Sequence, residues 1–126
     1  MAQPRMRISA TTIGAPNPRA LGTFYARLLG WTIVEDEPDW VRLRSPDGAP
    51  GLSFQHERYF VPPVWPAEPG EQQMTSHLDI AVDDLEAAVA WALDAGATLA
   101  AFQPQDDVRV MLDPAGHPFC LFPDGA

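Results

Sequence analysis

The pattern of apolar and polar positions predicts two amphipathic helices. From Leu21 to Leu29, apolar residues recur at spacings of three, four, seven and eight positions, which is typical of one helical face. A helix is therefore expected over about Pro18–Leu29. A second is expected over about Asp84–Ala95, whose apolar face consists of Leu85, Ala88, Val89, Ala92 and Leu93.

Both predicted helices have start and stop signals. Asn17 before Pro18 is typical of an N-cap followed by proline in the first turn. Asp83 or Asp84 can cap the second helix, and Gly30 and Gly96 are expected to end the two helices.

The remaining apolar runs predict one strand before each helix and three after it. The strands of the first half are expected at about Arg5–Ile13, Trp31–Asp36, Trp40–Arg44 and Gly51–His56, and those of the second half at about Ser76–Val82, Thr98–Phe102, Val108–Asp113 and Pro118–Phe122. The segments SPDG (Ser45–Gly48) and DPAG (Asp113–Gly116) are expected to be the turns before the last strand of each half.

The two halves therefore repeat one order of elements, βαβββ. Gly30 and Gly96 lie 66 positions apart, and Gly48 and Gly116 lie 68 apart. We predict an α+β fold in a single domain, 1–126, with module one at about 5–57, a linker at about 58–75 and module two at about 76–123. A helix covers one face of a sheet, so the other face must be covered by the second module or line a cavity.

Composition narrows the class of protein. The 126 residues carry 17 acidic and 8 basic side chains, a net charge of −9, which disfavours binding to nucleic acid. Cys120 is the only cysteine, so no disulfide can form within the chain, as in proteins of a reducing compartment. No apolar run reaches the ~20 residues that a membrane helix needs, and the N-terminus lacks the apolar core of a signal peptide. We expect a cytoplasmic protein with no membrane segment.

Three segments carry a resemblance to a known family: PNPRALGTFYARLLGW, SHLDIAVDDLEAAVAWALDAGA and LDPAGHPFCLF. They resemble the vicinal oxygen chelate superfamily, which contains glyoxalase I, the bleomycin-resistance proteins and the extradiol dioxygenases, and more narrowly its glyoxalase-like group of bacterial proteins. The resemblance implies two βαβββ modules whose mixed sheets form a cup around a ligand, with the helices outside. It also implies a homodimer.

The resemblance implies metal ligands on the first and last strand of each module. The corresponding residues here are Ala10, Gln55, His77 and Cys120. Alanine has no donor atom, a glutamine amide is a poor ligand, and a cysteine in an apolar strand keeps a raised pKa. We therefore expect no cofactor and no family-type metal site. The alternative is a zinc site with His77 and Cys120 as two ligands, completed by Glu57, Asp79 or His117.

His77 and Cys120 also have other interpretations. His77 can hydrogen-bond a ligand or act as a base near neutral pH, or it can simply bond across a strand. Cys120 can be a nucleophile activated by His77, or a small buried hydrophobe. His117 is expected to serve the turn that contains it.

Alternation along the strands adds further pocket candidates. If Val41 and Leu43 pack under the helix, Trp40 and Arg42 face the cup. Arg109 and Met111 hold the analogous places in the second half. The alternative is that the arginines lie at the rim and pair with acidic side chains. Aromatic residues of the linker, Tyr59, Phe60 and Trp65, are expected to pack against the body of the protein, with some lining of the pocket.

These expectations lead to two classes of function. The first is a protein of the bleomycin-resistance type that binds a small organic molecule without metal. Its predicted pocket consists of His77, Gln55, Cys120, Trp40, Arg42, Arg109 and Met111. The second is a lyase, isomerase or dioxygenase, with an atypical metal site or with His77 as a metal-free acid–base catalyst. A role in protein interaction, with the cup unused, is a third alternative.

Overall fold

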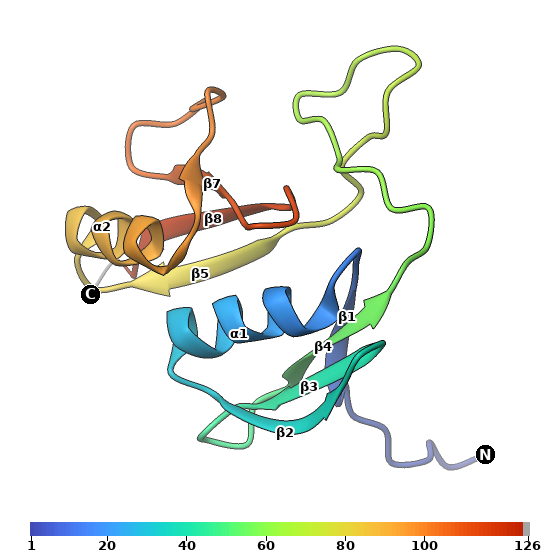
Figure 1. Ribbon diagram of the computed structural model, residues 1–126. Helices are drawn as coiled ribbons and strands as arrows, with labels where there is room; N and C mark the ends of the chain where they lie inside the picture. The colour runs from blue at the N-terminus through green and yellow to red at the C-terminus, as the bar shows by residue number, and fades with distance from the viewer. Residues whose placement is uncertain (125–126) are drawn as a thin grey trace. The chain divides into compact units, whose positions relative to one another are not determined.

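A computed structural model describes residues 1–124 of the chain and divides it into two compact units (Figure 1). Unit 1 comprises Met1–Arg58, and unit 2 begins at Tyr59. Each unit contains one helix and one four-stranded sheet. The predicted α+β class is confirmed, and the order βαβββ occurs once in each unit.

Unit 1 has its strands in the order β1-β4-β3-β2. Its elements are β1 (Ala10–Ala15), α1 (Pro18–Leu29), β2 (Thr32–Glu37), β3 (Trp40–Arg44) and β4 (Gly51–His56). β1 runs parallel to β4, and the other neighbours are antiparallel. The first and last strands of the module therefore lie side by side at the sheet's parallel edge.

Unit 2 repeats this arrangement in the order β5-β8-β7-β6. Its elements are β5 (Leu78–Val82), α2 (Leu85–Ala95), β6 (Thr98–Leu99), β7 (Arg109–Leu112) and β8 (Pro118–Pro123). β5 is parallel to β8, while β7 is antiparallel to both β8 and β6. Within residues 1–124, no helix combines the length and apolar character that crossing a bilayer requires.

The predicted helix signals are confirmed at both helices. The Asn17 side chain accepts a hydrogen bond from the backbone N–H of Ala20 at 3.1 Å, and Asp84 accepts one from Ala87 at 3.0 Å. Gly30 ends α1 in the left-handed conformation, with φ of 70°, which glycine adopts without steric cost.

Two strands are shorter than the sequence pattern predicts by three residues or more. The first begins at Ala10, not near Arg5. The strand expected to reach Phe102 ends at Leu99. There, the Gln103 side chain bonds both backbone groups of Val110, at 2.8 and 3.0 Å, in place of a neighbouring strand. The amide side chain of Gln103 thus takes the place of the backbone hydrogen bonds that a longer strand, favoured by the apolar pattern, would make to Val110.

The core of unit 1 lies between α1 and the β3–β4 pair. Tyr25 stacks on Phe54 with ring centroids 5.5 Å apart and an interplanar angle of 11°. Gly22 brings the helix close, because a Cβ there would lie 2.5 Å from Cγ1 of Val41. Glycine within a helix costs about 1 kcal/mol relative to alanine, and here it permits a contact that a side chain would block.

This packing leaves the opposite face of the unit 1 sheet without a helix. Val41 and Phe54 face α1, so alternation places Trp40, Arg42 and Gln55 on the other side. We call this side the helix-free face.

The two faces of the unit 2 sheet also differ in composition. Asp79 pairs with Cys120, and Cys120 pairs with Val110, so these three side chains share one face, the Cys120 face. Phe119 and Met111 pair with each other and lie on the opposite face, the Phe119 face.

Candidate functional site

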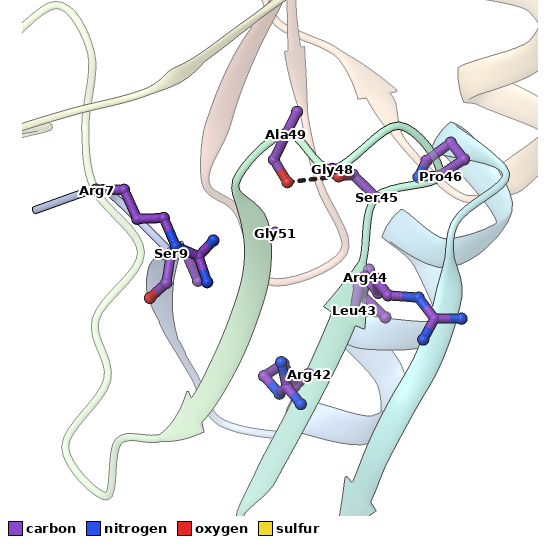
Figure 2. Close-up of a pocket in the computed structure, with 11 residues that line it drawn as sticks. Arg7, Ser9, Arg42, Leu43, Arg44, Ser45, Pro46, Gly48, Ala49 and Gly51 are labelled. Atoms are coloured by element: carbon purple, nitrogen blue, oxygen red, sulfur yellow. Dashed lines mark hydrogen bonds between the residues drawn. The ribbon is translucent and has the colours of Figure 1, made fainter. Parts of the chain in front are cut away.

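A hollow of about 350 Å³ opens in unit 1 beside the start of β4 (Figure 2). Arg42 and Arg44 reach it from β3, and Arg7 reaches it from the segment before β1. Its remaining wall comes from Ser9, Ala10, Gly51 and the turn after β3. We call this hollow the arginine pocket.

One arginine of the pocket is held by a network on the helix-free face. Glu35 of β2 accepts hydrogen bonds from Nε of Arg42 at 2.8 Å and from Nε1 of Trp40 at 2.7 Å. These bonds, that of Arg42 first, hold the pKa of Glu35 below its usual value. The network fixes the guanidinium of Arg42 and the indole of Trp40 relative to each other.

Trp40, Arg42 and Gln55 are brought together on this face. Gln55 lies opposite Trp40 across the β3–β4 pair, and its Nε2 donates to Oε1 of Glu57 at 2.8 Å. Ala10, at the other family ligand position of unit 1, lines the arginine pocket with a methyl group. These two positions offer a neutral amide, which is a poor metal ligand, and a methyl group, which is none.

In unit 2, His77 and Cys120 lie together with Asp79. One donor atom of each residue lies within 4.8 Å of the other two. His77 Nε2 is 3.0 Å from Oδ1 of Asp79. The register of β5 against β8 brings the three residues together, because it places Asp79 beside Cys120. His77 precedes Asp79 by two positions, and alternation therefore puts both side chains on the same face. We call this set the His77–Asp79–Cys120 cluster.

The Cys120 thiol in this cluster is buried and resists ionisation. Burial is the main reason that its pKa is raised, and the charge and hydrogen bond of Asp79 raise it further. At neutral pH the residue is therefore a thiol, not a nucleophilic thiolate.

Replacing Asp79 by asparagine is expected to lower the Cys120 pKa, because a neighbouring negative charge is removed. The midpoint should stay above the value of about 8.5 that an exposed thiol shows, since burial remains. Ultraviolet absorbance of the thiolate, followed against pH, measures the midpoint. Asp83→Asn makes the same charge change at an exposed position and should leave it unmoved.

The raised pKa of Cys120 also makes the stability of the protein depend on pH. A folded-state pKa above the unfolded one means that the free energy of unfolding falls as the pH rises from the unfolded towards the folded pKa. Asp79→Asn should reduce this fall. An unaltered midpoint in Asp79→Asn would show that Asp79 does not act on the thiol.

Aromatic residues adjoin the cluster. The indole of Trp65 stacks on the His77 ring with centroids 4.9 Å apart, and Phe102 packs edge-on to Trp65 at 5.2 Å. Trp65 and Phe102 also line a groove of about 300 Å³ with Val110 and Pro118. Trp65 packs against its own unit, as predicted, and additionally contacts a site residue.

Arg109 and Met111 are not brought to the cluster. Met111 is fully buried on the Phe119 face, opposite to Cys120. Arg109 shares that face by alternation, and its Nη1 donates to the backbone oxygens of Asp106 and Val108 at 2.9 and 3.1 Å. The register of β7 is the reason, because it sets Val110 beside Cys120.

His117 lies in the DPAG turn region, as predicted. Its backbone N–H donates to Oδ1 of Asp113 at 3.0 Å, and its ring packs edge-on to Phe60 with centroids 5.1 Å apart. It does not belong to the set of donors that surrounds Cys120.

Solved structures of similar fold come from several bacteria. A glyoxalase/bleomycin resistance protein/dioxygenase family enzyme from Burkholderia phytofirmans is 20% identical, with a TM-score of 0.69 over 90% of this chain and 94% of that one. A glyoxalase family protein from Enterococcus faecalis is 23% identical, with a TM-score of 0.67 over 92% and 96%. An antibiotic binding protein from Streptomyces is 18% identical, with a TM-score of 0.60 over 97% and 98%.

No curated protein matches the chain. The family model described as a glyoxalase-like domain matches residues 10–122. The match begins with β1, ends in β8 and includes both βαβββ units. The duplicated topology and this match together show that the chain belongs to the glyoxalase-like domain family.

Proposed function

We propose that this protein binds a small organic molecule and needs no family-type metal to do so. The observation that carries the proposal is the helix-free face of unit 1, which presents Trp40, Arg42 and Gln55 beside a hollow. Small-molecule sites combine concave shape and aromatic surface with a few fixed polar groups. The similar fold of an antibiotic binding protein from Streptomyces supports the same class of function.

His77 and Cys120 of unit 2 remain proposed contacts of the ligand. Arg109 and Met111 are left out, because they lie on the Phe119 face. The predicted homodimer and cytoplasmic location remain part of the proposal. The four family ligand positions do not fit a metal as a set, since Ala10 has no donor atom and the neutral amide oxygen of Gln55 is a weak ligand.

Thermal unfolding with a panel of neutral, anionic and cationic aromatic compounds, in the presence of a chelator, tests the proposal. A ligand at a hundredfold excess over its Kd stabilises the folded state by about 2.7 kcal/mol. At least one class of compound should raise Tm, and Trp40→Ala should reduce the rise. Trp91→Ala, at an exposed position of α2, is the matched control. A panel without any stabilising compound would contradict the proposal, as would a rise that Trp40→Ala leaves intact.

A second candidate is a metal-dependent lyase, isomerase or dioxygenase, which the His77–Asp79–Cys120 cluster favours. Imidazole, carboxylate and thiolate are the donor types that zinc takes, and a catalytic site commonly has three protein ligands. A metal held there would supply Lewis-acid polarisation of a substrate oxygen. In a metal-free version, His77 paired with Asp79 would serve as the base.

Titration with Zn²⁺ and with Co²⁺ tests the metal-dependent candidate. Cys120 must lose its proton to bind, so affinity should rise with pH. The Co²⁺ complex should show a thiolate charge-transfer band that Cys120→Ser abolishes. His56→Ala, in unit 1, is the control and should leave Zn²⁺ affinity unchanged. Absence of binding at mildly alkaline pH, or equal binding by Cys120→Ser, would reject this candidate.

A further inference from the structure

The arginine pocket differs in charge from the rest of the protein. All eight basic residues of the chain are arginines, and three of them line this one hollow. Although the chain has 17 acidic residues, none is among the described residues that line the pocket. Asp47 belongs to the turn beside it but is exposed and outside the lining.

The charge is also divided between the units. Residues 1–58 contain seven arginines and six acidic residues, whereas residues 59–126 contain one arginine and eleven acidic residues. Unit 1 therefore has a net charge of +1 and unit 2 one of −10, which together give the −9 of the chain. The arginine pocket lies in the one unit that does not repel an anion.

The three arginines of the pocket come from two segments that the sheet joins. Arg42 and Arg44 are two positions apart on β3, so both lie on the helix-free face (Figure 2). Gly51 donates a backbone hydrogen bond to Ser9 at 2.9 Å, which ties the segment carrying Arg7 to β4. The Ser45 hydroxyl donates to the Ala49 carbonyl and closes the turn that forms the wall.

Only one of these arginines has its charge compensated within the described chain. Arg42 pairs with Glu35. Arg7 and Arg44 form no ion pair among residues 1–124. Arg7 and Arg44 thus leave uncompensated positive charge in the lining of the hollow, which favours an oxyanion there through charge-assisted hydrogen bonds. Guanidinium suits this role because its donors match the oxygens of carboxylate and phosphate in pairs.

We propose that the arginine pocket binds the acidic group of the organic ligand, with the uncompensated guanidiniums of Arg7 and Arg44 supplying positive charge to its lining and Arg42 held there by Glu35. The inference rests on the proposed function, because it assigns the chemical class of that ligand as a carboxylate, sulfate or phosphate attached to an organic body. Trp40, bonded to the same Glu35, then offers an aromatic surface to that body.

NMR titration of the ¹⁵N-labelled full chain tests the inference with three probes at constant ionic strength: phenyl phosphate, inorganic phosphate and phenol. Phenyl phosphate should shift the amides around the arginine pocket and bind more tightly than inorganic phosphate, because only the former has an aromatic body. Phenol, which lacks the anion, should leave the amides of Ser9 and Arg44 unshifted.

Variants assign the effect to the pocket. The double variant Arg7→Gln and Arg44→Gln should weaken phenyl phosphate binding about tenfold or more. Arg27→Gln, on α1 outside the pocket, removes the same type of charge and should keep the affinity within about twofold. Both variants alter exposed side chains, and their amide spectra verify folding.

The outcomes separate this inference from the proposed function. Equal affinity for phenyl phosphate and inorganic phosphate would overturn the inference in favour of a site for free anions. If Arg27→Gln weakens binding as much as the double variant, the effect comes from the overall charge of the protein and the inference is also overturned. If phenol or another neutral compound shifts Trp40 and Gln55 while the pocket stays silent to both phosphates, the inference fails and the proposed function stands. If no compound of any class binds, both fail.

Discussion

Replacing Phe54 with alanine is expected to lower the free energy of unfolding by about 3–5 kcal/mol. Phe54 is fully buried in β4, pairs with Val41 and Ile13 on the neighbouring strands and stacks on Tyr25 of α1. Its ring also lies beneath Gly22. The side chain thus connects the helix to three strands, and removing it leaves a cavity that the sheet cannot close.

Phe54→Leu is the matched control. It retains most of the apolar volume and loses the stacking on Tyr25, which is worth about 0.5–1.5 kcal/mol. Equilibrium urea denaturation followed by far-ultraviolet circular dichroism gives both values. A loss below about 1 kcal/mol in Phe54→Ala would mean that α1 is not held by this contact.

The second large effect is expected at the DPAG turn. Asp113 is buried, and its Oδ1 accepts hydrogen bonds from the backbone N–H groups of Ala115 and His117, both at 3.0 Å. Asp113→Ala removes both bonds and leaves two amide donors unsatisfied in the turn. Hydrogen bonds to a charged group contribute about 1.5–3 kcal/mol, and a loss of at least that size is expected for the variant.

Asp113→Asn separates the geometry of this acceptor from its charge. The asparagine oxygen can replace Oδ1, so this variant should lose less than half as much stability as Asp113→Ala. Urea denaturation provides the comparison. Because the turn leads directly into β8, Asp113→Ala should also disturb the amide resonance of Cys120. Equal stability of Asp113→Ala and wild type would refute the role of the turn.

The two candidate functions use different units of one duplicated fold. In unit 1, the helix-free face carries Trp40 and Arg42 next to an arginine pocket. In unit 2, the Cys120 face carries a set of potential metal donors. Membership of the family is compatible with either, since a shared fold does not determine the chemistry of its site.

Some site residues could have been found from the sequence and others could not. Arg44 lies two positions from Arg42 on a correctly predicted strand, so alternation alone places it on the same face. Asp79 bears the same relation to His77, and it is one of the three side chains expected as a third ligand of a zinc site. Arg7 gave no such signal, because it lies in a segment without period whose path depends on distant contacts. Trp65 was expected only as one of several linker aromatics, and its contact with His77 depends on the path of the linker.

The sequence by itself determined the elements whose signals are local. The bounds of α1, β3 and β4 agree with the pattern, because caps, turn residues and periodicity act within a few positions of one another. The duplicated order of elements follows from the same local signals, which occur once in each half of the sequence.

Only the tertiary structure decided which of these residues meet. The register of β7 against β8 set Val110 beside Cys120 and placed Met111 on the opposite face, and a shift of one position would have exchanged them. The same is true of Arg7, which joins Arg44 only because a backbone bond between Gly51 and Ser9 ties its segment to β4. Pairing between strands is a contact between residues far apart in the chain, and the apolar pattern of one strand cannot specify its partner's register.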